Sequence, residues 1–274
     1  QGKYGPSEAY DALETAINLT ILDARAMGLK TPAGQVSPEV ALKNLQDMQK
    51  QIVSQTNRSG TKDTMQQFST PPAYSYVVSQ FVNMDARDVV LEPSAGTGDL
   101  AIHALNQRAK VHVNELDPKR AEMLKAVQES AEDRLTISTE DALQLGNIMG
   151  PNLRPSVVLM NPPFSREGQR MGDKKMSGND RNHIDAAMAS LIDGGRLVAI
   201  IGAGLHGPSK GFTTWLAETA KKHNVRANIE VSRDVYKGYG TTFPTRVLVI
   251  DKGTPTPKDG TLTAQADSLE HLLT

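Results

Sequence analysis

The sequence contains no cysteine, so disulfide bonds and thiolate metal sites are excluded within this chain. No apolar run approaches the roughly 18 residues that a membrane-spanning helix requires, and no secretory signal is visible at the start. We therefore expect a soluble cytoplasmic protein that contacts no membrane and holds no metal. The chain begins with Gln1 instead of methionine, which suggests a piece of a longer protein or a processed start.

The chain also lacks an excess of charge of either sign. Lys and Arg number 30 and Asp and Glu number 31, which gives a formal net charge of −1. Any surface that binds nucleic acid must therefore be local or come from a partner. A chain of 274 residues can bury about three quarters of its unfolded surface, enough for one large domain with an appendage.

The most informative motif is Asn161-Pro162-Pro163-Phe164, which directly follows the apolar run 157–160. Neither proline has an N–H group, so a strand must stop pairing there and leave backbone carbonyls at the carboxyl edge of a sheet. The Asn161 side-chain oxygen and the Pro162 carbonyl can accept the two hydrogens of an exocyclic amine, and Phe164 can stack on its base. The pattern favours a site for adenine, cytosine or guanine over an ordinary Asn-Pro turn.

A glycine turn lies upstream of this motif, between an apolar strand at 88–92 and a helix that starts near residue 99. Its spacing also fits a dinucleotide-binding loop, because an acidic residue follows about twenty residues later. The strand, however, ends in Glu92, which would repel a pyrophosphate but can pair with the ammonium of S-adenosylmethionine. The candidate cofactor-binding residues in and beside this turn are Glu92, Ser94, Ala95, Gly96, Gly98 and Asp99.

Two more expected strands, 111–113 and 135–138, are each followed by acidic residues. Glu115 can accept both ribose hydroxyls of the cofactor, and Asp141 can accept from its adenine amino group. Their neighbours Leu116 and Ala142 are included among the candidate cofactor-binding residues. The alternative is structural: the glycines turn the chain, and the acidic side chains cap the helices that follow.

These features resemble motifs I to IV of the amino-methyltransferases, which use S-adenosylmethionine and whose DNA-adenine members carry Asp/Asn-Pro-Pro-aromatic. Phe68 and Thr70 resemble motif X, the segment that lies over the methionine group of the cofactor, and Thr70 would bond the cofactor carboxylate. The order X, I, IV is similar to the γ arrangement of DNA N6-adenine methyltransferases. The resemblance implies that Asn161, Pro162, Pro163 and Phe164 are catalytic, with Asn161 also touching the cofactor.

The order of expected elements predicts an α/β fold. Two amphipathic helices fill the first sixty residues, and strands and helices alternate from residue 85 onward, which is typical of a mostly parallel sheet. The last two strands, 228–233 and 246–251, lack a connecting helix and should pair antiparallel. This resembles the Rossmann-like seven-stranded methyltransferase sheet with an N-terminal helical appendage. We expect a helical segment at 1–60, the methyltransferase core at 61–255 and a tail at 256–274.

The expected activity is methyl transfer from S-adenosylmethionine to the N6 amine of adenine in DNA. Methyltransferases that act on RNA adenine, on guanine N2 or on a release-factor glutamine carry the same type of Asn-Pro-Pro-aromatic motif and are alternatives. A further alternative is a non-catalytic scaffold that binds the cofactor. The polar segments 165–182 and 234–245 are candidate substrate-facing loops, whereas His183 is expected to be a cap or surface residue.

A narrower resemblance links the N-terminal helices and the segment around Gly240 to the methyltransferase module of strawberry-notch-like helicase polypeptides of phages and plasmids. It implies that further domains or subunits deliver the DNA. No separate C-terminal target-recognition domain follows the last expected core strand, so sequence specificity would be loose or would depend on another part of the assembly.

Overall fold

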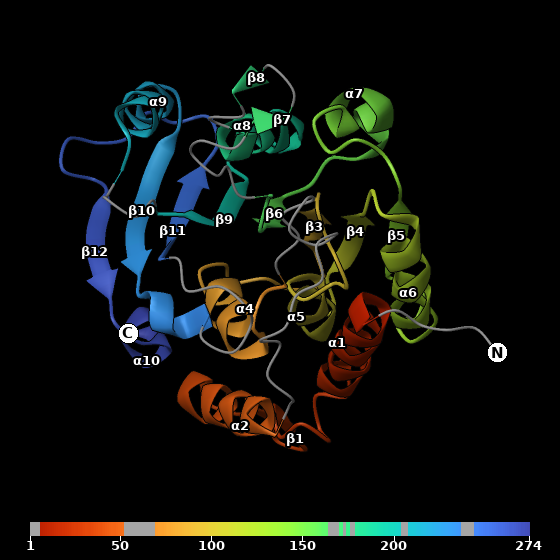
Figure 1. Ribbon diagram of the computed structural model, residues 1–274. Helices are drawn as coiled ribbons and strands as arrows, with labels where there is room; N and C mark the ends of the chain where they lie inside the picture. Colours follow the sequence, from red (N-terminus) through yellow and green to blue (C-terminus); the bar gives the residue numbers. More distant parts are fainter. Residues whose placement is uncertain are drawn as a thin grey trace.

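The computed structural model describes residues 6–51, 69–163, 170–171, 174–175, 179–203, 208–236 and 244–274. A central sheet with helices on both faces dominates the molecule (Figure 1). Its eight strands are β3 (Val89–Glu92), β4 (Lys110–Asn114), β5 (Leu135–Ser138), β6 (Val157–Met160), β9 (Arg196–Gly202), β10 (Asn224–Val231), β11 (Thr245–Asp251) and β12 (Leu262–Ala266). Their order across the sheet is β12-β10-β11-β9-β6-β3-β4-β5.

One strand of this sheet runs against the others. β11 pairs antiparallel with both β9 and β10, while the other neighbouring strands pair parallel. The expected mostly parallel α/β sheet with an antiparallel final hairpin is therefore confirmed. β12 extends it by an eighth strand, parallel to β10, which comes from the segment 256–274 that was expected as a tail.

The helices form two layers (Figure 1). One layer contains α1 (Pro6–Leu22), α2 (Pro38–Lys50), α4 (Pro72–Ser79), α5 (Ala101–Asn106), α6 (Pro118–Glu129) and α10 (Leu269–Leu273). The opposite face carries α7 (Leu145–Met149), α8 (Asn179–Ser190) and α9 (Lys210–Ala220). The smaller elements are the pairs β1 (Lys30–Thr31) with β2 (Gly34–Gln35) and β7 (Arg170–Met171) with β8 (Lys174–Lys175), and the 3₁₀ turns η1 (Gly150–Asn152) and η2 (Arg233–Tyr236).

The sheet separates two hydrophobic cores, because successive side chains of a strand point to opposite faces. Val90 and Leu159 belong to the core beneath α2, α4 and α5, whereas their neighbours Leu91 and Val158 belong to the core beneath α8. All four are at most 1% exposed. Burial of each such side chain contributes roughly 1.5–3 kcal/mol, so packing on both faces holds the strand ends in place.

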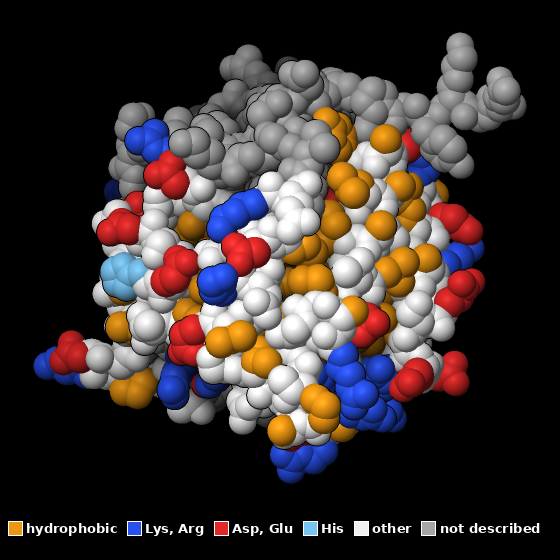
Figure 2. Space-filling view, turned by 90° about the horizontal axis from the view of Figure 1, so that it is seen from below, with side chains coloured by type: hydrophobic (Ala, Val, Ile, Leu, Met, Phe, Trp, Pro, Cys, Tyr) orange, Lys and Arg blue, Asp and Glu red, His pale blue; other side chains and the backbone are white. Residues whose placement is uncertain are grey.

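The N-terminal helices belong to the first layer. α1 packs against α5 and α6, and α2 packs against α4. Ser37 accepts a hydrogen bond from the Val40 backbone N–H, and Pro38 follows it, which is a favourable start for α2. Figure 2 shows that the described acidic and basic side chains are interspersed on this side of the molecule, so it presents no uniformly basic surface. Across the part of the chain that the structure describes, no helix has the length and apolar character needed to cross a membrane.

Candidate active site

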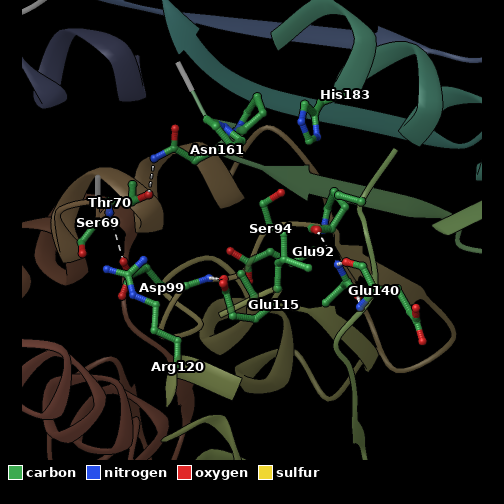
Figure 3. A pocket seen from close by; sticks show the side chains of 18 of the residues that line it. Ser69, Thr70, Glu92, Ser94, Asp99, Glu115, Arg120, Glu140, Asn161 and His183 are labelled. Carbon is green, nitrogen blue, oxygen red and sulfur yellow. Dashed lines mark hydrogen bonds between the residues drawn. The ribbon is translucent and has the colours of Figure 1, made fainter. Parts of the chain in front are cut away.

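A cavity of about 230 Å³ lies where β3, β4, β5 and β6 end (Figure 3). The carboxyl ends of parallel strands meet at one edge of a sheet, which brings residues from distant motifs together. The sequence-predicted residues that line the cavity are Thr70, Glu92, Ser94, Ala95, Gly96, Asp99, Glu115, Leu116, Asp141, Ala142, Asn161, Pro162 and Pro163.

Three predicted site residues do not appear in this lining. Gly98 belongs to the glycine turn but does not face the cavity. Phe68 and Phe164 lie outside the described residues, as does most of the candidate loop 165–182 and the part of the second loop from 237 to 243. The stacking role of Phe164 and the cofactor contact of Phe68 remain predictions.

The glycine turn requires its glycines for conformational reasons. Gly96 and Gly98 have φ angles of +58° and +94°, a region that side chains with a Cβ rarely enter. A Cβ at Gly98 would also lie 3.1 Å from Leu124 Cδ2. The turn is closed by a hydrogen bond of 2.8 Å from Gly98 N to Ala95 O. The chain can therefore reverse tightly between β3 and α5 and expose its backbone to the cavity.

Glu92 is the buried carboxyl at the floor of the cavity. It is 2% exposed, and its Oε2 accepts a hydrogen bond of 2.7 Å from the backbone N–H of Ala101, at the start of α5. Burial, together with the nearby charge of Asp99, raises the pKa of Glu92 well above its ordinary range. A positively charged ligand group in the cavity would favour the ionised form of this side chain.

Glu115 is fixed by two backbone donors. Its Oε2 accepts from Gly96 N at 2.7 Å and its Oε1 accepts from Asp117 N at 2.8 Å. Burial raises the pKa of Glu115, while these hydrogen bonds and the charge of Arg120 oppose the rise. Asp141, at the end of the next strand along the sheet edge, is exposed and accepts from Leu143 N at 2.9 Å. Both side chains thus bind local backbone donors, but neither caps a helix as the structural alternative supposed: Asp117 is the N-cap of α6 and Gln144 that of α7.

Asn161 is connected to the motif that precedes α4. Its Nδ2 donates to Thr70 Oγ1 at 2.9 Å, and Thr70 N donates to Asp99 Oδ2 at 3.0 Å (Figure 3). Segments separated by 91 residues along the chain are joined in this way. The hydrogen bond to Thr70 orients the Asn161 amide so that its oxygen points away from Thr70.

Helix α1 closes one side of the site, which the sequence did not predict. Asn18 Nδ2 donates to Asp99 Oδ1 at 2.9 Å and to Thr97 O at 3.0 Å, and Ser69 Oγ donates to Glu14 Oε2 at 2.6 Å. Burial and the proximity of Glu14 raise the pKa of Asp99 to about 7, although the hydrogen bonds that it accepts oppose the rise. The N-terminal segment therefore contributes buried polar contacts directly to the glycine turn.

Several residues at the cavity were not singled out from the sequence. Asn114 Nδ2 donates to Pro93 O at 3.1 Å and to Glu140 O at 2.8 Å, so it holds three strand ends together. His183 was expected to be a cap or surface residue, but it lines the cavity, and burial lowers its pKa. The unpredicted lining residues are Ser69, Pro93, Asn114, Arg120, Glu140 and His183. No cluster of His, Asp and Glu suited to a metal ion occurs among the residues described.

Comparison with known proteins agrees with this architecture. The model of the N-6 DNA methylase family matches residues 44–271, which is most of the chain. The chain belongs to the N-6 DNA methylase family. The matched region contains every strand of the main sheet and all the predicted site residues, whereas α1 lies before it.

One curated protein similar to this chain is the type II restriction enzyme and methyltransferase RM.BcgI of Heyndrickxia coagulans. The two are 22% identical over 188 residues, which cover 62% of this chain and 29% of that protein. This chain therefore spans less than a third of the length of the curated relative that it matches.

Solved structures show the same fold. A modification subunit of a putative type I restriction enzyme from Vibrio vulnificus aligns with a TM-score of 0.56 and 17% identity, covering 86% of this chain and 57% of the other. A putative class I S-adenosylmethionine-dependent methyltransferase from Listeria monocytogenes aligns with a TM-score of 0.55 and 17% identity, covering 95% and 86%. The expected Rossmann-like fold is thereby confirmed. Membership of the N-6 DNA methylase family implies S-adenosylmethionine as the cofactor, as predicted from the sequence.

Proposed function

We propose that the chain transfers a methyl group from S-adenosylmethionine to the exocyclic N6 amine of adenine in DNA. The observation that carries this proposal is the position of Asn161-Pro162-Pro163 at the end of β6, in the wall of the cavity. The candidate site for the target amine and the candidate site for the cofactor thus share one cavity. Direct transfer of a methyl group between two bound molecules requires this proximity.

The cavity fits the polar groups of S-adenosylmethionine. We assign Glu92 to the ammonium of its methionine group, Glu115 to the ribose hydroxyls and Asp141 to the adenine amine, with Ser94, Ala95, Gly96, Leu116 and Ala142 forming the walls. Thr70 lies on the methionine side of this arrangement and Asp141 on the adenine side. The acidic lining suits a ligand with more positive than negative charge. When bound, the cofactor supplies an electrophilic methyl group on a sulfonium.

Asn161 and Pro162 would hold and activate the target amine. The lone pair of an aryl amine is delocalised into the ring, which makes the nitrogen a weak nucleophile. Acceptance of its two hydrogens by Asn161 Oδ1 and the Pro162 carbonyl would increase electron density on the nitrogen and orient it toward the methyl group. Thr70 holds the amide in the required orientation by accepting from Nδ2 at 2.9 Å.

The DNA substrate and its delivery are also part of the proposal. Two of the proteins named above, from Heyndrickxia coagulans and Vibrio vulnificus, are named as restriction-modification proteins, and the chain spans 29% and 57% of them. We infer a larger assembly in which further domains or subunits hold the DNA and the segment 61–255 acts as the methyltransferase core. A base in a duplex would have to be flipped into the cavity, at a cost of a few kcal/mol.

Nucleoside mass spectrometry tests this proposal. The full chain is incubated with S-adenosylmethionine and, separately, unmethylated duplex DNA, single-stranded DNA and RNA. N6-methyladenine is expected in DNA. Asn161→Ala should lower the rate by about 100-fold or more, because one of two transition-state hydrogen bonds is lost. Its affinity for S-adenosylhomocysteine should change by at most about tenfold, near the upper end of the effect of one neutral hydrogen bond.

Asn152→Ala is the matched control, because Asn152 is an exposed residue of the η1 turn and should leave the rate unchanged. Methylated adenine or guanine in RNA alone would contradict the DNA assignment while retaining the amine site. The absence of a methylated base from all three substrates, despite cofactor binding, would contradict an autonomous nucleic-acid methyltransferase.

A further inference from the structure

Arg120 occupies an unusual position at the cavity. Among the described residues that line it, Arg120 is the one Lys or Arg, whereas Glu92, Asp99, Glu115, Glu140 and Asp141 are acidic. Arg120 is 4% exposed, so its guanidinium is held in the protein interior. Burial removes the guanidinium from water, and this costs free energy unless a partner of opposite charge compensates for the lost hydration.

One partner is provided by α1. Arg120 Nη2 lies 3.0 Å from Asp11 Oδ1, and both side chains are at most 8% exposed. Burial opposes the charge of Arg120, but the attraction of Asp11, followed by Glu14 and Glu115, raises its pKa above the ordinary value. The guanidinium therefore stays charged under all ordinary conditions.

This ion pair leaves part of the guanidinium without a partner. The Nε atom of Arg120 is buried and makes no hydrogen bond. A buried donor of this kind is costly unless a ligand or another group satisfies it. Nη1 lies 3.6 Å from the position that a Cβ on Gly96 would occupy, so the guanidinium is close to the glycine turn. Figure 3 shows it at the same end of the cavity as Ser69 and Asp99.

The groups around Arg120 determine the ligand chemistry. This inference rests on the proposed function, in which the methionine group of the cofactor lies at the end of the cavity formed by Thr70 and Glu92. That group carries a carboxylate as well as an ammonium, and a carboxylate entering an acidic cavity requires a cation. Thr70 already donates its backbone N–H to Asp99 and accepts from Asn161 at its hydroxyl, so its hydroxyl proton is the donor that remains.

We propose that Arg120 binds the carboxylate of the cofactor's methionine group, and that Asp11 of α1 positions Arg120 for this contact. Arg120 is then a binding residue and Asp11 a positioning residue. Since α1 precedes the region 44–271 matched by the family model, the N-terminal helix would supply a part of the cofactor site that lies outside that region.

Two ligands isolate the carboxylate contact. S-adenosylhomocysteine and its decarboxylated analogue share the adenosine, the sulfur and the amine, and differ in the carboxylate alone. Calorimetric titration of the parent chain should show tighter binding of S-adenosylhomocysteine by about 10- to 100-fold, the effect of a charge-assisted hydrogen bond. In Arg120→Gln this ratio should fall to about threefold or less. Arg120→Lys should retain an intermediate ratio, because a lysine supplies charge without the planar pair of donors.

The ratio of the two affinities distinguishes the loss of the carboxylate contact from general damage to the fold. Arg120→Gln removes the ion pair with Asp11. The double variant Asp11→Asn/Arg120→Gln is therefore measured as well, and it should show the same small ratio with higher thermal stability than Arg120→Gln. Asp11→Asn alone should reduce the ratio partially, because Arg120 loses its positioning contact. Arg154→Gln, at an exposed arginine, is the matched control and should keep the parental ratio.

The outcomes distinguish a wrong assignment of Arg120 from a wrong proposed function. A parental ratio in Arg120→Gln, or a parent chain that binds both ligands equally, would overturn the assignment of Arg120 while leaving the proposed methyltransferase intact. A parent chain that binds neither ligand would contradict the proposed function and the assignment of Arg120 together.

Discussion

The two ends of the cavity are built in different ways. Glu115 and Asp141 follow β4 and β5, so the order of strands in the sheet brings them side by side. The opposite end is assembled from α1, α6 and the segment before α4, through contacts such as the ion pair between Asp11 and Arg120. The first end depends on a sheet common to many methyltransferases, while the second depends on how an appended helix docks.

This difference indicates which part of the site can change without altering the sheet. The strand ends are fixed by packing on both faces of the sheet, so a change there alters the whole site. A docked helix contributes side chains without altering the sheet. We therefore expect substitutions at the strand ends to weaken every adenosine ligand, and substitutions at α1 to affect stability and the methionine side selectively.

The largest effect is expected from Glu115→Gln at the strand-end side. The affinity for S-adenosylhomocysteine and for its decarboxylated analogue should fall equally, by about 10- to 100-fold. The reason is that a glutamine has one acceptor oxygen and would place an NH₂ group beside the backbone donors Gly96 N or Asp117 N. Calorimetric titration of both ligands measures this change.

Glu129→Gln on the exposed surface of α6 is the control for that substitution and should leave both affinities unchanged. A selective loss of S-adenosylhomocysteine binding in Glu115→Gln would contradict the division of the cavity, because the strand-end side would then recognise the methionine carboxylate.

A smaller effect is expected from Asn18→Leu in α1. This substitution should lower the free energy of unfolding by about 2 kcal/mol, because the buried acceptors Asp99 Oδ1 and Thr97 O each lose a donor. Urea denaturation of the variant measures the loss, with Thr20→Ala on the exposed side of α1 as the control. A loss below about 0.5 kcal/mol would indicate that these contacts do not hold α1 to the glycine turn.

The most gradual effect, spread over several pH units, is a change in the pH dependence of stability at Asp99. Because its folded-state pKa is about 7 and its ordinary value is 3.8, the folded protein retains a proton that the unfolded chain releases between these values. The parent therefore loses stability relative to Asp99→Asn as the pH rises through this window, by at most about 1.4 kcal/mol per pH unit. Above the window the difference should be constant.

Urea denaturation at several pH values between about 4.5 and 8 measures this difference. Asp47→Asn is the control, because hydrogen bonds from Lys50 and Lys43 lower the pKa of that exposed carboxyl to about 2, outside the window. Parallel stability profiles of Asp99→Asn and the parent would show that Asp99 does not carry the raised pKa.

The sequence was most predictive where the signals were local. The strand-turn-helix pattern around Gly96 and Gly98 predicted the turn, and the positive φ angles explain why glycines occupy it. Acidic residues directly after apolar strands predicted that Glu115 and Asp141 would meet at one sheet edge. Asn161 was placed correctly beside the cavity because the two prolines end its strand.

No local sequence pattern predicted the contacts of α1. Asp11 and Arg120 are 109 residues apart, and Asn18 and Asp99 are 81 residues apart, so their pairing depends on the docking angle of a helix. The apolar pattern of α1 predicted a helix but not which helices it packs against. β12 was missed for another reason: Leu262–Ala266 is mostly exposed in the sheet, and two of its three alternating apolar residues are alanines, which are uncommon in strands.

The most direct test of the two-ended cavity is the crystal structure of the full chain with S-adenosylhomocysteine bound. The account predicts that the ribose lies on Glu115 with the adenine toward Asp141, and that the ligand carboxylate meets the Arg120 guanidinium beneath α1. A ligand bound with its carboxylate away from Arg120 would contradict the role given to α1, and a ligand bound elsewhere would contradict the site itself.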